Sequence, residues 1–463
     1  PLLAGKLAML ISGGVFFHGS LFLVRSAGLR LSDELIVAWV LALTIPGWMS
    51  NHVTPDLLVA GLMAFALGQA VSPDWLANRR RVLGTGATWG LAYLAKAVAL
   101  PVGVVVSVLL ALCWRLGQAE NRRAAWRQLG VSLGLLALVA APWITVLSLK
   151  YDKPTFSTTG PIAHAIVGPE DQKPAPHPFG STIYKPEQGR VTAWEDPSRM
   201  DYDYWSPFAS GENFSHQLSL IGRNAGTVFQ FLATFDGVGV LLKWFGVGTL
   251  VFGLALFAKR PWTKNWLAAR WRWMVVPLIC LGGVYLPVYV LPVDQQRYFY
   301  LFLPLIMILT LGLVSPFFAR KWLVRFILAF FFLSPLLWPA PSRYPAGSFA
   351  QTLANQMEKA GMVGPIVGST FVGLTLFPRE VHRLGLYVAW HLGQPWHGDL
   401  GPFSTEVYKT SEAYKTSGAR FTIALENSSL SKQLDADVAF KNVSAKLGEK
   451  GSLQVYEIQE SQP

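Results

Sequence analysis

The sequence predicts an α-helical membrane protein with many spans, a long loop outside the bilayer and a small α/β domain at its C-terminal end. Of its 463 residues, 52% are hydrophobic, only 14% are charged and 18 are Trp. That composition is too apolar and too aromatic for a soluble protein of this length. Apolar runs near the ~20 residues that cross a bilayer recur along the first three quarters of the chain, and the last ~120 residues contain none.

The apolar runs define about ten spans, so we expect an integral, multi-pass membrane protein. They cover Lys6–Val24, Glu34–Met49, Pro55–Val71, Leu83–Ala95, Ala97–Trp114, Leu129–Leu149, Val238–Ala258, Trp273–Val290, Arg297–Pro316 and Trp322–Trp338. Lys and Arg fall in alternate connections, which the positive-inside rule places in the cytoplasm. These residues are Arg25, Arg30, Arg79, Arg80, Arg81, Arg115, Arg122, Arg123, Arg127, Lys259, Arg260, Lys264, Arg270, Arg272, Arg320 and Lys321.

The alternation requires the apolar stretch Leu83–Trp114 to cross the bilayer twice, with Lys96 and Pro101 marking the outer turn. Each crossing then has only about 16 residues, which is short for a span. A single long, kinked helix is the alternative, and it would reverse the orientation of everything that follows. The hairpin is the preferred interpretation because it keeps the Arg-rich segment Arg122–Arg127 in the cytoplasm.

Four regions follow from this topology. Residues 1–149 and 238–339 are the two transmembrane parts, residues 150–237 are an extracytoplasmic insertion, and residues 340–463 are an extracytoplasmic α/β domain. The end of the insertion, Leu218–Phe235, is amphipathic, which suits a helix along the membrane surface. The C-terminal domain is expected to contain helices and one sheet. The helices are Phe349–Ala360 and Val407–Thr416, and the strands are Gly364–Ser369, Arg420–Glu426 and Ser452–Ile458.

Several functional classes are disfavoured. The formal net charge is +12, but the Lys and Arg residues sit in short connections between apolar runs, so no nucleic-acid partner is expected. Cys113 and Cys280 lie inside apolar spans and do not indicate a disulfide framework. The sequence has no P-loop, no dinucleotide-binding glycine motif and no nucleophile elbow, so no nucleotide cofactor is expected.

Ionisable residues at the outer rims of spans are the candidate site, because charges in lipid are costly. Asp56 and His52 lie in the segment Ser50–Asp56, where Thr54 could cap a helix and Asp56 could simply face its dipole. That explanation leaves His52 without a role. Lys96 is a lone cation that suits a phosphate, although snorkelling to the headgroups explains it nearly as well.

Arg297 is the strongest candidate, because it stands at the outer start of a predicted span with Asp294 before it and Tyr298 after it. An Arg fork and free N–H groups at a helix start together suit a phosphate. An Arg297–Asp294 pair that only caps the helix is the alternative. The insertion contains further carboxylates and imidazoles that could bind a substrate, although loops also carry such residues for solubility. They are His164, His177, Glu195, Asp196, Asp201, Asp203 and His216. Neither their spacing nor the pair His391 and His397 matches a metal motif.

The layout resembles the GT-C superfamily of membrane glycosyltransferases, the group of the protein O-mannosyltransferases and the lipid A aminoarabinose transferases. The resemblance rests on the hairpin with Gly90–Lys96, the segment Thr54–Asp56, the segment Gln296–Tyr298 followed by Pro304, and the extracytoplasmic C-terminal domain. It implies transfer of a sugar, with inversion, from a polyprenyl-phosphate carrier to an acceptor lipid, glycan or protein outside the cytoplasm. It also implies a multi-pass protein of the bacterial inner membrane.

The candidate substrate-binding residues at the outer rim are Arg297, Lys96, Asp56, His52, Tyr298 and Asp294, and the resemblance implies that Arg297 and Lys96 meet the phosphate of the carrier. The resemblance does not assign the catalytic residue, because the family carries that acid in the first outer loop, which is expected to lie upstream of Pro1. A role for a divalent metal stays open. Two other classes compete: a transporter or flippase for a lipid-linked oligosaccharide, and a non-catalytic membrane scaffold. The rim position of the cations and the lack of a repeat favour the transferase.

Overall fold

The computed structural model describes residues 2–51, 53–117, 122–169, 182–196, 202–234, 296–314, 346–368, 384–400, 407–447 and 453–459. The chain divides into two compact units. Unit 1 comprises residues 1–161 and 207–339, and unit 2 comprises residues 162–206 and 340–463. The long insertion is therefore shared between the units, and its middle part, residues 162–206, belongs with the C-terminal region.

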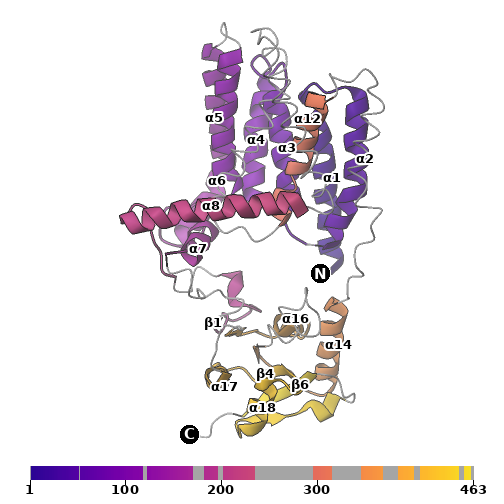
Figure 1. The fold of residues 1–463 in the computed structure, drawn as a ribbon, viewed down its shortest axis with the longest axis vertical. Helices are drawn as coiled ribbons and strands as arrows, with labels where there is room; N and C mark the ends of the chain where they lie inside the picture. The colour runs from indigo at the N-terminus through magenta and orange to yellow at the C-terminus, as the bar shows by residue number, and fades with distance from the viewer. Residues whose placement is uncertain are drawn as a thin grey trace. The chain divides into compact units, whose positions relative to one another are not determined.

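Unit 1 is built from helices that run alongside one another (Figure 1). They are α1 Leu2–Ser26, α2 Leu31–Asn51, α3 Asp56–Val71, α4 Arg79–Ala95, α5 Ala99–Gly117, α6 Arg122–Lys150 and α12 Phe302–Val314, with the crosswise helix α8 Gly211–Thr234 and the 3-10 helix η6 Gln296–Phe299. Among the described residues, Leu3–Ser26, Leu31–Met49 and Arg123–Lys150 are long and apolar enough to cross a membrane, and Asp56–Val71 and Ala99–Arg115 are shorter apolar helices. The chain is an integral membrane protein.

The stretch Leu83–Trp114 folds as a hairpin rather than as one long helix. Helix α4 ends at Ala95, and α5 begins at Ala99. The backbone N–H of Ala99 donates to the carbonyl of Lys96 at 3.0 Å, which closes the turn. A Cβ on Gly103 would lie 2.8 Å from the Trp89 ring, so the absent side chain lets α5 pack directly on α4. The first six predicted spans thus correspond to α1–α6, and the ninth corresponds to η6 with α12. The other three predicted spans lie outside the described residues: Val238–Ala258, Trp273–Val290 and Trp322–Trp338.

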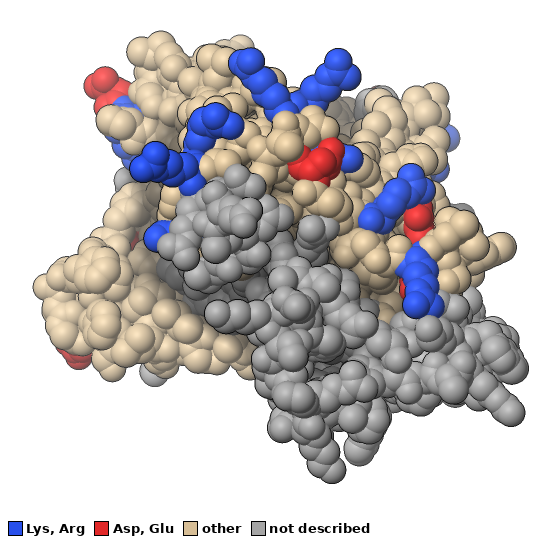
Figure 2. Space-filling model, turned by 90° about the horizontal axis from the view of Figure 1, so that it is seen from above, with Lys and Arg blue, Asp and Glu red and all other residues tan. Residues whose placement is uncertain are grey.

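The basic connections gather at one end of the helices, as the alternation of charge predicts. Figure 2 looks onto this end and shows Lys and Arg side chains spread over it, with few acidic ones. The described members are Arg25, Arg30, Arg79, Arg80, Arg81, Arg115, Arg123 and Arg127, at the end of α1, the connection to α2, the start of α4, the end of α5 and the start of α6. The opposite ends of α2, α3 and α4 carry the candidate site.

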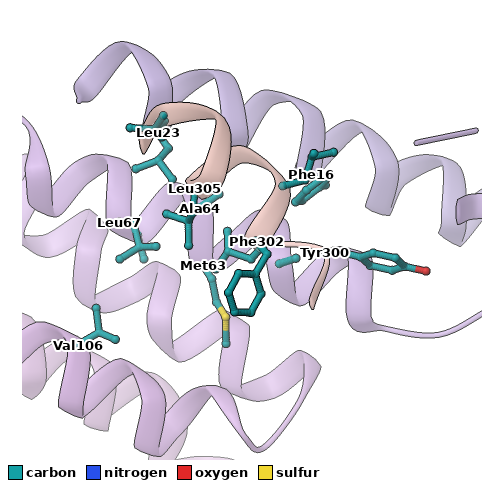
Figure 3. Close-up of a cluster of buried hydrophobic side chains, with 14 of the residues drawn as sticks. Phe16, Leu23, Met63, Ala64, Leu67, Val106, Tyr300, Phe302 and Leu305 are labelled. Carbon is teal, nitrogen blue, oxygen red and sulfur yellow. The ribbon is translucent and has the colours of Figure 1, made fainter. Parts of the chain in front are cut away.

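Close approach of α1 to α3 forms the centre of the unit 1 core. A Cβ on Gly61 of α3 would lie 2.6 Å from the backbone nitrogen of Phe16, so only glycine allows this contact. Small residues at such contacts let membrane helices pack backbone to backbone. Figure 3 shows Phe302 and Leu305 from the α12 segment among buried side chains of α1 and α3. The segment that carries Arg297 is therefore anchored in the same core.

Unit 2 contains a four-stranded sheet in the order β2-β4-β6-β5, with β2 parallel to β4 and the other neighbours antiparallel. Its elements are α14 Ala346–Lys359, β2 Ile366–Val367, α16 Leu384–His391, β3 Gly398–Asp399, α17 Val407–Thr416, β4 Phe421–Leu425, α18 Ser429–Ala436, β5 Phe440–Asn442, the 3-10 helix η9 Ser444–Leu447 and β6 Leu453–Ile458. The three predicted strands do share one sheet, and both predicted helices are present. Only two residues of the predicted strand Gly364–Ser369 pair as a strand.

The insertion contributes a second, two-stranded sheet to unit 2. Strand β1, Thr182–Ile183, pairs antiparallel with β3. The backbone N–H of Trp396 donates to the carbonyl of Val191 at 2.6 Å, just before the 3-10 helix η2, Ala193–Glu195. Helix α7, Thr159–Ile166, stands where the chain passes from unit 1 to unit 2. Backbone hydrogen bonds therefore join the insertion to the C-terminal region, although these segments are far apart in the sequence.

Candidate functional site

Asp56 is the buried carboxylate of the candidate site. It is the first residue of α3 and only 6% exposed. The prediction that Thr54 caps this helix is wrong, because Pro55 occupies the N-cap position with helical backbone angles and the Thr54 hydroxyl has no partner among the described residues. A buried carboxylate needs compensating charge, and the helix dipole supplies only part of it.

Lys96 supplies the first compensating cation. It follows α4 directly, and its backbone N–H donates to the carbonyl of Ala92. Its Nζ pairs with Oδ1 of Asp56, although the two residues lie forty positions apart in the sequence. The Lys96 side chain keeps 32% of its surface exposed, so it remains within reach of a ligand. Simple snorkelling does not describe this lysine, because it turns back to a carboxylate of its own protein.

Arg297 supplies the second cation. Its Nε lies 3.1 Å from Oδ2 of Asp56, while its side chain is 26% exposed. The Nε–H does not point along a hydrogen bond to that oxygen, so the contact is an ion pair without hydrogen-bond alignment. Asp56 thus holds one cation on each carboxylate oxygen.

The backbone around Arg297 differs from the prediction. Arg297 lies in the 3-10 helix η6, and the α-helix begins only at Phe302. Pro304 explains the late start, because proline is tolerated in the first turn of an α-helix but not in its interior. The free N–H groups of an α-helix start are therefore not beside Arg297, and its guanidinium is the group that can hold an anion.

Aromatic side chains fix this cluster from two sides. The Lys96 Nζ lies 4.2 Å from the centroid of the Tyr298 ring, a distance that suits a cation–π contact. Tyr300 stacks on Trp48 of α2 with ring centroids 4.3 Å apart. Both of these stacked residues are buried, and they belong to the apolar core that holds α12. The stack therefore sets the position of the short segment that presents Arg297 and Tyr298.

The structure brings together four of the six candidate residues: Asp56, Lys96, Arg297 and Tyr298. His52 and Asp294 lie outside the described residues. Trp48 and Tyr300 were not predicted, since one aromatic residue inside a span is ordinary and only their stacking gives them a role. Tyr93 was also missed: one turn before Lys96, its hydroxyl donates to the carbonyl of Phe156 at 2.9 Å and fixes the start of the insertion.

Three other candidate residues of the insertion make structural contacts, and His177 and Asp201 lie outside the described residues. The Glu195 carboxylate accepts from the backbone N–H of Val191 at 2.8 Å, and Asp196 lies 3.7 Å from Arg190. The imidazole of His164 stacks on the Trp205 ring. In the described part of the chain, no group of three or more His, Cys, Asp or Glu residues is arranged to hold a metal ion.

Neither a family model nor a curated protein matches the sequence. Two solved structures are similar to the chain. ArnT from Cupriavidus metallidurans bound to undecaprenyl phosphate is 15% identical, with a TM-score of 0.47, and the match covers 98% of this chain and 83% of that chain. The Archaeoglobus fulgidus oligosaccharyltransferase in complex with zinc and sulfate is 12% identical, with a TM-score of 0.49 and coverage of 91% and 56%. Similarity at this level assigns neither a family nor a reaction.

Proposed function

We propose that the chain is a glycosyltransferase that takes its sugar from a polyprenyl-phosphate carrier and acts outside the cytoplasm. The observation that supports this proposal is the pairing of Lys96 and Arg297 on the single buried carboxylate of Asp56. Counting the described residues alone, two cations against one carboxylate leave one formal positive charge in excess, at the helix ends opposite the basic connections. A lipid-borne phosphate meets water at such a rim.

The donor groups that remain suit a phosphate. Arg297 turns Nε toward Asp56, and its Nη1 and Nη2 have no hydrogen bond or ion pair within the described residues. This edge of the guanidinium can donate two parallel bonds to phosphate oxygens. Lys96 uses one of its three donors on Asp56 and can turn another toward the same anion.

Asp56 and Tyr298 then act as positioning groups. Asp56 holds both cations a short distance apart, which lowers the entropy lost when an anion binds between them. Tyr298 covers Lys96 with the face of its ring and limits access of water to the ammonium. The acceptor is a lipid, glycan or protein of the outer compartment, and the reaction uses no nucleotide cofactor.

Binding of undecaprenyl phosphate, the ligand named for one of the similar structures, tests the site. The purified protein in detergent should bind it and should not bind undecaprenol, which has the same tail without the phosphate. Arg297→Lys keeps the charge but loses the fork, so the affinity should fall by roughly one to two orders of magnitude, for the loss of about 1.5–3 kcal/mol. Native mass spectrometry measures both ligands.

Arg81→Lys is the matched control, because Arg81 is also ion-paired and lies in the first turn of α4, at the opposite end from Lys96. It should leave binding unchanged. Equal binding of undecaprenol, or full affinity in Arg297→Lys, would contradict the phosphate site. Transfer is tested separately with radiolabelled undecaprenyl-phosphate sugars: label that appears on an acceptor identifies a transferase, whereas label that only changes leaflet identifies a flippase.

A further inference from the structure

Helix α8, Gly211–Thr234, presents three different faces. Its 24 residues correspond to about 36 Å of helix, long enough to extend over several neighbouring helices. In Figure 1 it runs across the axes of α4, α5 and α6 rather than along them. The Ser210 hydroxyl accepts from the backbone N–H of Asn213 and fixes the start of α8.

The first face of α8 packs against the protein. Gln217, Leu220, Asn224 and Val228 are buried and recur at the spacing of one helical face. Val228 belongs to the same hydrophobic cluster as the membrane helices. The helix consequently rests on the apolar part of unit 1 and does not stand away in solvent.

The second face is apolar and exposed. Phe214 is 48% exposed and Leu218 is 54% exposed, and the half-buried Ile221 and the exposed Ala225 continue this stripe at a spacing of three and four residues. The stripe lies about 100° around the helix from the packed face. Leaving Phe and Leu side chains in water forgoes their transfer free energy, so the stripe indicates an apolar environment.

The third face is polar and lies on the far side of the stripe. Ser215, Ser219, Arg223 and Gln230 are exposed there. Protein, apolar surface and polar surface thus follow one another around the helix. A helix at the boundary of a bilayer needs this order, with one side toward acyl chains and the next toward headgroups and water.

We infer that the Phe214–Leu218–Ile221–Ala225 stripe of α8 lies in the headgroup and acyl-chain boundary of the bilayer. Three observations carry the inference: the crosswise direction of α8, the membership of Val228 in the membrane-helix core, and the order of the three faces. The occupant of the stripe is lipid rather than a second protein, because the stripe adjoins a face that already packs on membrane helices. Arg223 on the polar face is placed to meet lipid phosphates.

Site-directed spin labelling of the full chain in liposomes tests this placement. Cys113→Ala and Cys280→Ala remove the native thiols. Single cysteines then replace Leu218 and Ala225 on the stripe, with Ser219 as the matched control on the adjacent polar face. The stripe labels should collide several-fold more with oxygen, relative to a water-soluble nickel chelate, than the Ser219 label does.

Two outcomes would overturn the inference. Equal oxygen-to-nickel ratios at all three positions would place the stripe in water. Protection of the stripe labels from both reagents would show that protein covers it. Ala225→Cys changes a small exposed side chain, so this position remains informative if Leu218→Cys perturbs the fold. The test does not depend on transfer activity.

Discussion

Asp56→Asn is the substitution that most directly probes the candidate site. It removes the negative charge, nearly conserves the shape of the side chain and leaves Lys96 and Arg297 beside a neutral amide. A pair of unit charges 4 Å apart is worth about 4 kcal/mol at an effective dielectric constant of 20. Both cations are about one-third exposed or less, so solvent reduces each contribution to roughly 1–2 kcal/mol. The free energy of unfolding should therefore fall by about 2–4 kcal/mol.

A double-mutant cycle separates this charge effect from other losses. Lys96→Met alone should destabilise the protein, because it leaves Asp56 with one partner. In the double variant Asp56→Asn/Lys96→Met the loss should be smaller than the sum of the single losses by about 1 kcal/mol or more. SDS-induced unfolding from mixed micelles, followed by circular dichroism, measures all four proteins.

The control is Glu34→Gln, which breaks an ion pair with the exposed Arg25 at the opposite end of the helices. Its unfolding midpoint should stay close to that of the unmodified protein. Strict additivity of Asp56→Asn and Lys96→Met would refute the reasoning, and so would an unchanged stability of Asp56→Asn.

Two further predictions concern packing and pH. Gly61→Ala should destabilise unit 1 by about 1–3 kcal/mol, because the new methyl group meets the backbone of α1. The control is Gly14→Ala, which should be neutral or stabilising in the same SDS titration because nothing lies within 4 Å of the new Cβ. Burial lowers the pKa of His397, so unit 2 keeps this imidazole neutral, while the unfolded chain takes up a proton near pH ~6.5. Stability of unit 2 should be complete above that pH and fall below it. Hydrogen exchange of the β1–β3 amides measures the effect, which His397→Gln should abolish.

The periodicity of apolar residues was sufficient to predict the helices of unit 1. Long apolar runs separated by Arg-rich connections leave few alternatives, and the hairpin at Lys96 followed from the charge alternation alone. The boundaries at the site were less predictable, because they depend on single prolines. Pro55 moves the cap of α3, and Pro304 delays the start of α12, so Thr54 and the N–H groups expected beside Arg297 do not have the predicted roles.

Unit 2 shows where sequence patterns stop being informative. Strand β1 has only two residues, and it is defined by its pairing with β3 rather than by any pattern of its own. Trp396 holds the insertion through a backbone hydrogen bond, which no side-chain property signals. Pairing between segments about two hundred residues apart is set by tertiary context, and local propensity carries little of that information.

The candidate site was predictable as a set of residues but not as an arrangement. Each of Asp56, Lys96 and Arg297 had a simple local explanation: a helix dipole, snorkelling, or a cap with a near neighbour. In the structure, Asp56 is the partner of both cations, and the three residues come from three separate segments. If these local roles were the whole reason for the three charges, each residue could fulfil its role without contacting the other two. A buried carboxylate that holds two partly exposed cations is instead suited to exchange: it keeps the cations in place while the site is empty, and an incoming phosphate can share them without new charges entering the lipid.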